Sequence, residues 1–229
     1  MLDVELEVGF VTGPGKPLGS RIPIAEWEEH VFGLVLVNDW SARDIQAFES
    51  QPLGPFLGKS FATTVSPWVV TLAALEPYRV PGPDQEPPPM GYLSTPEDGA
   101  YDIDLTIELQ GGQMAATGTP PWVVSRTNFR RMYWSMAQQL AHASSNGAPV
   151  RAGDLFASGT ISGPSRESAG SLMEVTWRGA DPISLPDGST RIFLEDGDTV
   201  IMRGRCTRQD RPPIGFGECR GTVVPSLAD

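Results

Sequence analysis

Alternation of apolar and polar residues predicts a half-buried strand at the start of the chain, with Leu2, Val4, Leu6, Val8 and Phe10 on its apolar face. Strict alternation is the pattern of a strand that has one face against a core. The continuous apolar run over 31–37 instead predicts a strand that is buried on both faces. Further strands are predicted near Leu155 and over 65–75 (interrupted at Pro67), 101–109, 172–177, 192–194, 200–205 and 222–224.

Helical signals are fewer than strand signals. Ser41 can cap a short helix, and Asp44 follows three residues later as a weak capping-box partner. One long helix is expected to begin at Thr127 or Asn128 and to stop at Asn146-Gly147. Its apolar positions at helical spacing are Phe129, Met132, Tyr133, Met136 and Leu140. Turns are predicted at Gly111-Gly112, Asp187-Gly188 and Asp196-Gly197.

Together these elements predict a β-rich α+β fold. The chain shows neither strand–helix–strand alternation nor a Gly-rich phosphate loop, which argues against Rossmann and P-loop folds. Its 229 residues are compatible with one large domain. The proline-rich stretch over 78–96 is expected to be a surface excursion within that domain, because strand patterns resume on both sides of it.

The charge balance argues against several classes of partner. Acidic residues outnumber basic ones 28 to 17, so the net charge of −11 disfavours nucleic acid and anionic membranes but suits a bound cation. The longest apolar runs fall well short of the roughly 20 residues that span a bilayer, and no signal peptide is visible. Cys206 and Cys219 form neither a disulfide scaffold nor a zinc site, so a reducing cytoplasmic location is expected.

Acidic side chains share one face of the first predicted strand. Asp3, Glu5 and Glu7 alternate with the apolar positions, and residues two apart lie about 6.6 Å apart along a strand. Two such carboxylates could converge on a hard cation such as Mg²⁺ or Ca²⁺, or they could form an ordinary solvated face. The strand over 101–109 repeats the arrangement with Asp102, Asp104 and Glu108. Spacing alone therefore leaves both interpretations open.

Other candidate residues lie where predicted elements end. Asp39 follows the buried strand, and Arg43 and Gln46 share one face of the helix after it. A guanidinium and an amide side by side can donate hydrogen bonds to an oxyanion or carboxylate, although Arg43 could instead pair with Glu49 or Asp39. Lys59 lies in a loop made rigid by Pro and Gly, where it could polarise a carbonyl or simply face solvent.

The second half of the chain offers weaker signals. The small polar loop over 158–163 could hold a substrate carboxylate through its amides and hydroxyls, although such turns are common without a ligand. Glu174 taken alone is an ordinary strand acid. His30 and His142 are expected to be structural, and no order of Ser, His and Asp suggests a catalytic triad.

Several segments, in order along almost the whole chain, resemble the fumarylacetoacetate hydrolase family. They are Val4-Glu5-Leu6-Glu7, NDWSARDIQ at 38–46, PLGPFLGKS at 52–60, Phe129 with MYW at 132–134, ASGTISG at 157–163 and GFG at 215–217. The proline-rich excursion and the long tail resemble one branch of the family more than the shorter acylpyruvate hydrolases.

The resemblance implies a mixed β-sandwich roll that forms a homodimer. It also implies a divalent cation, Mg²⁺ and/or Ca²⁺, that is held by Glu5, Glu7 and Asp39. Lys59 and Thr63 would lie near this cation. Asp3, Asp102 and Asp104 have no ligand role in the family pattern.

The resemblance further implies the catalytic roles. Arg43, Gln46 and Lys59 would polarise the substrate carbonyl and stabilise the oxyanion, and Glu174 would orient a histidine base that activates water. The implied reaction is hydrolysis of a carbon–carbon bond of fumarylacetoacetate to fumarate and acetoacetate, in the breakdown of tyrosine and phenylalanine.

The small-molecule diketo acid substrate would contact Gln46, Ser50 and Thr160, where Ser50 replaces a tyrosine of the family pattern. The base histidine, a further acidic ligand and another substrate tyrosine lie upstream of the first strand in the family. We therefore expect residues 1–229 to be the C-terminal catalytic part of a longer enzyme, lacking its base. A non-catalytic module that binds a cation or a diacid, and a hydrolase of another 1,3-diketo acid, remain alternatives.

Overall fold

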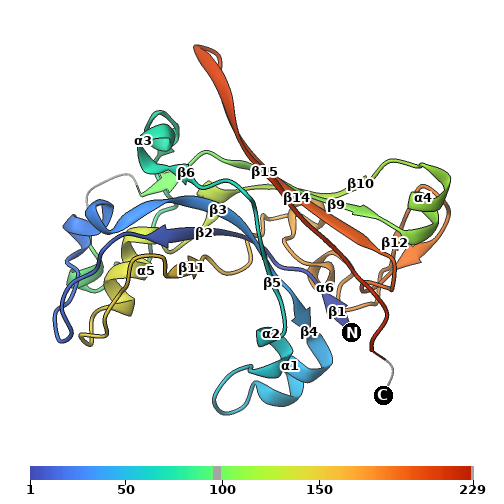
Figure 1. The fold of residues 1–229 in the computed structure, drawn as a ribbon, viewed down its shortest axis with the longest axis horizontal. Helices are drawn as coiled ribbons and strands as arrows, with labels where there is room; N and C mark the ends of the chain where they lie inside the picture. Colours follow the sequence, from blue (N-terminus) through green and yellow to red (C-terminus); the bar gives the residue numbers. More distant parts are fainter. Residues whose placement is uncertain (95–98, 228–229) are drawn as a thin grey trace.

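The computed structural model describes residues 1–94 and 99–227. A curved sheet carries the first long strands of the chain, in the order β11–β2–β3–β5, and β6 also pairs with β3 (Figure 1). Its strands are β2 (Leu6–Thr12), β3 (Val31–Asp39), β5 (Thr63–Val65), β6 (Val70–Thr71) and β11 (Leu155–Ala157). The apolar run over 31–37 does form a strand, and Leu34 to Val37 are at most 1% exposed.

A second sheet packs against the first and runs in the order β10–β9–β14–β15. Its strands are β9 (Asp104–Gln110), β10 (Trp122–Asn128), β14 (Thr199–Arg208) and β15 (Arg211–Thr222). β14 and β15 form a long hairpin whose tip projects beyond the rest of the molecule in Figure 1. The strand pairings within the described residues are antiparallel, so the parallel pairs that a mixed sheet requires are not found among them.

The hydrophobic core lies between the two sheets. Leu105, Ile107 and Leu109 alternate along β9 and are buried, as the periodicity predicts. Close approach of the sheets depends on Gly204 of β14, because a Cβ there would lie 2.8 Å from Cδ2 of Leu36 on β3. Contact between the sheets makes the β-sandwich, and the β-rich α+β fold is confirmed.

Three two-residue ladders complete the strands. β1 (Leu2–Asp3) pairs with β4 (Ser41–Ala42), β7 (Arg79–Val80) with β8 (Ala100–Tyr101), and β12 (Ile183–Ser184) with β13 (Thr190–Arg191). The predicted first strand is therefore broken at Val4-Glu5, where the chain moves from pairing with β4 to pairing with β3. The predicted turn at Asp187-Gly188 joins β12 to β13.

The helices are short, and the longest, α5, has eight residues. The α-helices are α1 (Arg43–Glu49), α2 (Leu57–Ser60), α3 (Leu72–Leu75), α4 (Gly112–Thr117), α5 (Met136–Ala143) and α6 (Leu172–Val175). The 3₁₀ helices are η1 (Ile24–His30), η2 (Glu76–Tyr78), η3 (Gly91–Leu93), η4 (Phe129–Arg131) and η5 (Arg166–Ser168). No helix in the described ranges is long and apolar enough to cross a membrane.

The predicted long helix over 127–146 is wrong. β10 continues to Asn128, whose side chain accepts a hydrogen bond from the amide of Arg130 and caps η4. The chain is then extended at Met132, and α5 begins only after Ser135, which forms a capping box with Gln138. Apolar residues at helical spacing are compatible with one long helix or with a short turn followed by a separate helix. The capping box at Ser135 starts a separate helix here.

Other local predictions also fail. Ser41 is not a cap, because its hydroxyl donates to the carbonyl of Asp39, although the predicted helix does form as α1. The strand predicted over 172–177 is helix α6, which Ser171 caps. Five further predictions are corrected. The segment 65–75 turns helical at Leu72, 101–109 breaks at Asp102-Ile103, and Gly112 begins α4. The segment 192–194 lies beyond the end of β13, and 222–224 lies largely beyond the end of β15.

The proline-rich stretch runs without helix or strand over 81–90 and is mostly exposed there. Short elements flank this part, namely η2 and β7 before it and η3 after it. Thr95 and Pro96, the end of the predicted excursion at 78–96, lie outside the described residues.

Candidate metal centre and active-site cavity

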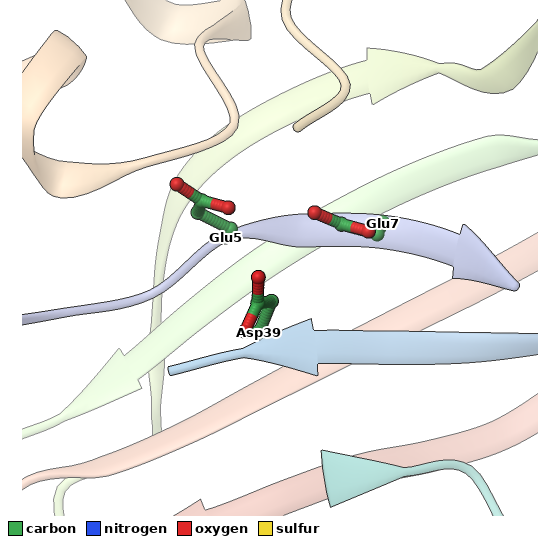
Figure 2. Close-up of side chains that lie close together, drawn as sticks. All are labelled: Glu5, Glu7 and Asp39. Atoms are coloured by element: carbon green, nitrogen blue, oxygen red, sulfur yellow. The ribbon is translucent and has the colours of Figure 1, made fainter. Parts of the chain in front are cut away.

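Three carboxylates converge where β2 begins and β3 ends (Figure 2). Antiparallel pairing aligns Leu6 with Asn38, and the amide of Asp39 donates to the carbonyl of Glu5 at 3.2 Å. Asp39 therefore lies opposite Glu5, and Glu7 follows two residues further along β2. Oxygen atoms of Glu5, Glu7 and Asp39 all lie within 4.8 Å of one another. The structure thus brings together the three residues that were predicted to hold a cation.

Lys59 lies between two of these carboxylates. Its Nζ is 2.9 Å from Oδ2 of Asp39 and 2.5 Å from Oε2 of Glu5. The short helix α2 presents this lysine, and the carboxylate of Glu49 accepts hydrogen bonds from the amides of Phe56, Leu57 and Gly58 at its start. A carboxylate at the N-terminus of α2 therefore fixes the turn that delivers Lys59.

Burial and like charges shape the protonation of the group. Burial, together with the charges of Glu5 and Asp39, raises the pKa of Glu7 to about 7, although a hydrogen bond from the amide of Gly159 opposes this shift. Burial also acts to raise the pKa of Glu5, but hydrogen bonds and charges from Lys59 and Arg43 outweigh it and lower that pKa. Converging oxygen ligands with a surplus of negative charge fit a hard divalent cation.

Arg43 of α1 is buried and connects the acidic group to the rest of the site. Its Nη1 donates to Oε1 of Glu5 at 2.7 Å and to Oε1 of Gln46 at 2.9 Å, and its Nε donates to Oδ2 of Asp3 at 2.8 Å. The alternative pairing with Glu49 or Asp39 is not among its contacts. The amide oxygen of Gln46 therefore accepts from Arg43, and the donor prediction for Gln46 concerns its Nε2.

Beside Arg43 lies an open cavity of about 540 Å³. It brings together residues from distant parts of the chain: Glu5, Arg43, Arg131, Met132, Tyr133, Thr160, Ser162, Ser171, Met173 and Glu174. Glu174 accepts hydrogen bonds from the hydroxyls of Ser162 and Ser171, at 2.9 and 2.8 Å. Thr160 and Glu174, whose roles were predicted from the family resemblance, thus line the same cavity as Arg43.

Six of the predicted site residues do not line this cavity: Glu7, Asp39, Gln46, Ser50, Lys59 and Thr63. The hydroxyl of Ser50 donates to the carbonyl of Gln46 at the end of α1. Thr63 pairs across the sheet with Asp39, which places it next to the acidic group, but its side chain is exposed. Both histidines lie elsewhere, since Nδ1 of His30 is 2.6 Å from the carbonyl of Pro14 and His142 contacts Tyr92.

The second acidic strand face remains separate. Asp102 and Asp104 both accept hydrogen bonds from Nδ2 of Asn128 and take no part in the cavity. Arg131 and Tyr133 of the cavity were not singled out by sequence reasoning. Tyr133 belongs to a segment that carried the family resemblance, whereas nothing in the local pattern pointed to Arg131.

Comparisons with known proteins point to one family. The model of the family described as "Fumarylacetoacetate (FAA) hydrolase C-terminal" matches residues 1–224. Fumarylacetoacetase of Homo sapiens is 54% identical over 227 residues, which cover 99% of this chain and 53% of the relative. Fumarylacetoacetase of Bos taurus is 52% identical and is also covered over 53% of its length. The chain thus spans about half the length of the relatives it matches.

Solved structures share the fold at low sequence identity. The 5-carboxymethyl-2-hydroxymuconate delta-isomerase from Mycobacterium smegmatis superposes with a TM-score of 0.57 at 20% identity, over 99% of this chain and 60% of that chain. A likeness at this identity concerns the fold alone, so the chemistry must be argued from the side chains.

Proposed function

We propose that this chain, which belongs to the fumarylacetoacetate hydrolase family, supplies the cation site and substrate cavity of an enzyme that hydrolyses fumarylacetoacetate to fumarate and acetoacetate. One observation carries the proposal: Glu5 belongs both to the acidic group with Glu7 and Asp39 and to the wall of the cavity beside Arg43. A cation and a cationic donor on adjoining surfaces suit a substrate with two carbonyl oxygens in a 1,3 relation.

Glu5, Glu7 and Asp39 would hold Mg²⁺ and/or Ca²⁺, with Thr63 as the cross-strand neighbour of Asp39. All three ligands offer carboxylate oxygen, which both of these hard cations prefer. When bound, the cation would act as a Lewis acid on the diketone oxygens and stabilise the enolate that leaves.

Arg43 and Lys59 would stabilise charge on the reacting carbonyl. Their cationic nitrogens lie on either side of Glu5, at 2.7 and 2.5 Å from its two oxygens. Water adds to the ketone carbon of the fumaryl group, which becomes the new carboxyl carbon of fumarate, and the oxyanion that forms is stabilised by these donors. The bond from that carbon to the adjacent methylene then breaks, and its electron pair leaves with acetoacetate, which takes up a proton. Gln46 holds Nη1 of Arg43 in place.

Glu174 and Thr160 would act from the other walls of the cavity. Thr160 lines the cavity and would contact a substrate carboxylate, and Glu174, which accepts from two serine hydroxyls, would orient a histidine base. Neither His30 nor His142 lines the cavity. Turnover is therefore expected only where a further segment or subunit supplies the base.

We further propose a homodimer, located in the cytoplasm, that acts in tyrosine and phenylalanine catabolism. Support for self-association comes from large apolar side chains around α1 and α2. Phe48 is 89% exposed, Leu53 81% and Leu57 70%. Large exposed apolar side chains concentrated in one stretch of the chain, 48–57, fit a protein interface.

The test is turnover of fumarylacetoacetate by the full-length gene product. The loss of the diketone would be followed with Mg²⁺, with Ca²⁺ and with a chelator. We expect turnover that requires the cation and that is lost in Glu5→Gln, while the matched strand variant Glu108→Gln keeps it. An intact, folded protein that leaves fumarylacetoacetate unchanged with either cation would contradict the proposal.

Two observations favour alternatives. The family pattern has a tyrosine at the position of Ser50, whose hydroxyl here donates to the carbonyl of Gln46, and the loss of that aromatic side chain favours another 1,3-diketo acid as substrate. The absence of a histidine from the cavity lining favours a module that binds a cation or a diacid without catalysis. A panel of diketo acids tests the first alternative. Calorimetric titration of this chain with Mg²⁺ and Ca²⁺, beside Glu5→Gln, tests the second.

A further inference from the structure

Asp3 is a buried carboxylate that touches three separate segments of the chain. Its side chain is 0% exposed, and it belongs neither to the acidic group nor to the cavity lining. Oδ1 accepts from the amides of Val4 and Leu172, both at 2.8 Å. Oδ2 accepts from Nε of Arg43 at 2.8 Å and from the amide of Met173 at 3.1 Å. Every contact of Asp3 is thus a donor that a neutral side chain could not satisfy as fully.

The bond to Arg43 fixes how that side chain faces the cavity. A guanidinium is a rigid planar fork, so holding Nε sets the plane and the direction of the terminal nitrogens. With Nε on Asp3, Nη1 is directed at Glu5 and Gln46. Without Asp3, Nη1 would be the only nitrogen of Arg43 held by these residues, through Glu5 and Gln46. The guanidinium could then rotate about Nη1.

The bonds to Leu172 and Met173 fix a second wall of the cavity. These amides open α6, the four-residue helix that carries Glu174. A helix of this length has too few internal hydrogen bonds to hold its own position. The carboxylate of Asp3 therefore ties α6 to the strand that leads into Glu5.

We propose that Asp3 is a positioning residue that holds Arg43 and Glu174 in register on one cavity. The proposal rests on the proposed function, because it concerns the same site. A single buried carboxylate sets the relative placement of the group that stabilises the oxyanion and the group that orients the base. Misplacement of catalytic groups by about 1 Å can cost about 10²-fold in rate.

The test replaces Asp3 in the full-length protein by Asn, which has the same shape but turns one acceptor into a donor. We expect kcat for fumarylacetoacetate to fall by about 10²-fold, with the calorimetric affinity for Mg²⁺ changed far less, because Glu5, Glu7 and Asp39 remain. The loss should shrink in an Arg43→Lys background, since Asp3 acts partly through Arg43. Equal fractional losses in both backgrounds, or an unchanged kcat in a folded Asp3→Asn protein, would overturn the proposal.

A matched control exists in Asp198, which is also 0% exposed and is paired with an arginine. Its Oδ2 and Oδ1 accept from Nε and Nη2 of Arg191 at 2.8 and 2.9 Å, and neither residue lines the cavity. Asp198→Asn should lower thermal stability while kcat stays unchanged. A fall in kcat equal to that of Asp3→Asn would show that loss of any buried ion pair is enough, and would overturn a positioning role.

A measurement without turnover separates this proposal from the proposed function. In nitrogen-15 NMR spectra, the Nε–H of Arg43 should be protected from solvent exchange, and its signal is assigned by its absence in Arg43→Lys. We expect the protection to be lost in Asp3→Asn and kept in Asp198→Asn. Persistent protection in Asp3→Asn would refute the role of Asp3, whereas an unaltered protein without turnover would refute only the proposed function.

Discussion

Cation affinity should depend steeply on pH, because one of the three carboxylates titrates near neutrality. Burial and the neighbouring charges of Glu5 and Asp39 raise the pKa of Glu7 to about 7. A carboxylate must be ionised to bind the cation. With a pKa of about 7, Glu7 is about 90% ionised at pH 8 and about 10% at pH 6, so affinity for Mg²⁺ should fall about tenfold across that interval.

Isothermal titration calorimetry of this chain with Mg²⁺ and with Ca²⁺ measures this dependence directly. Experiments in two buffers of different ionisation enthalpy should show about one proton released per cation near pH 6 and almost none well above pH 8. Glu7→Gln should bind more weakly, and its affinity should no longer change with pH in this range. Glu108→Gln, an acid on a separate strand, should keep the pH dependence of the unaltered chain.

The same pKa shift affects stability, with the opposite sign to a salt-bridged acid. Since the folded-state pKa of Glu7 lies above its ordinary value, the folded state holds the proton more tightly than the unfolded state. Without a cation, the free energy of unfolding should decrease as pH rises from about 4.5 to about 7, by about 1.4 kcal/mol per pH unit at most. For cation binding, an affinity for Mg²⁺ that is constant from pH 6 to pH 8 would refute the argument that Glu7 is a ligand with a pKa of about 7.

Three further predictions follow from the packing of the site and the core. Asp39→Asn should weaken Mg²⁺ by at least about tenfold in calorimetry, because a charged ligand becomes neutral, whereas Asp102→Asn should have little effect; equal losses would mean that the acidic strands are misassigned. Gly58→Ala would place a Cβ 2.7 Å from the backbone nitrogen of Gln46, so α1 and α2 must separate; turnover should fall, and unchanged turnover would show that the α2 turn tolerates displacement. Leu36→Ala removes a side chain that is 0% exposed between the sheets, and urea unfolding should show a loss of about 2–5 kcal/mol; a loss below that of a surface substitution would contradict the sandwich packing.

Local pattern was sufficient for the strands that build the site. The apolar run over 31–37 and the alternation over 6–10 predict β3 and β2, because burial of one or both faces leaves a direct trace in the order of residues. It was not sufficient where caps decide the outcome. The interval 127–146 contains a strand end, a 3₁₀ turn and a helix. Helical spacing alone does not show that a new helix begins after the capping box of Ser135 and Gln138.

What the sequence by itself determined is which side chains share a face: Glu5 with Glu7, and Arg43 with Gln46. It could not decide between the acidic face of the first strand and that of 101–109, because alternation says nothing about the partner strand. Only the tertiary structure brings Asp39 and Lys59 to the first face and leaves Asp102 with Asn128. The burial of Asp3 and the position of Glu174 in helix α6 likewise depend on contacts between distant parts of the chain, because Asp3 and Met173 are 170 residues apart in sequence. Strand register brings Glu5, Glu7 and Asp39 together, and their burial shifts the pKa of Glu7. No local sequence pattern encodes either effect.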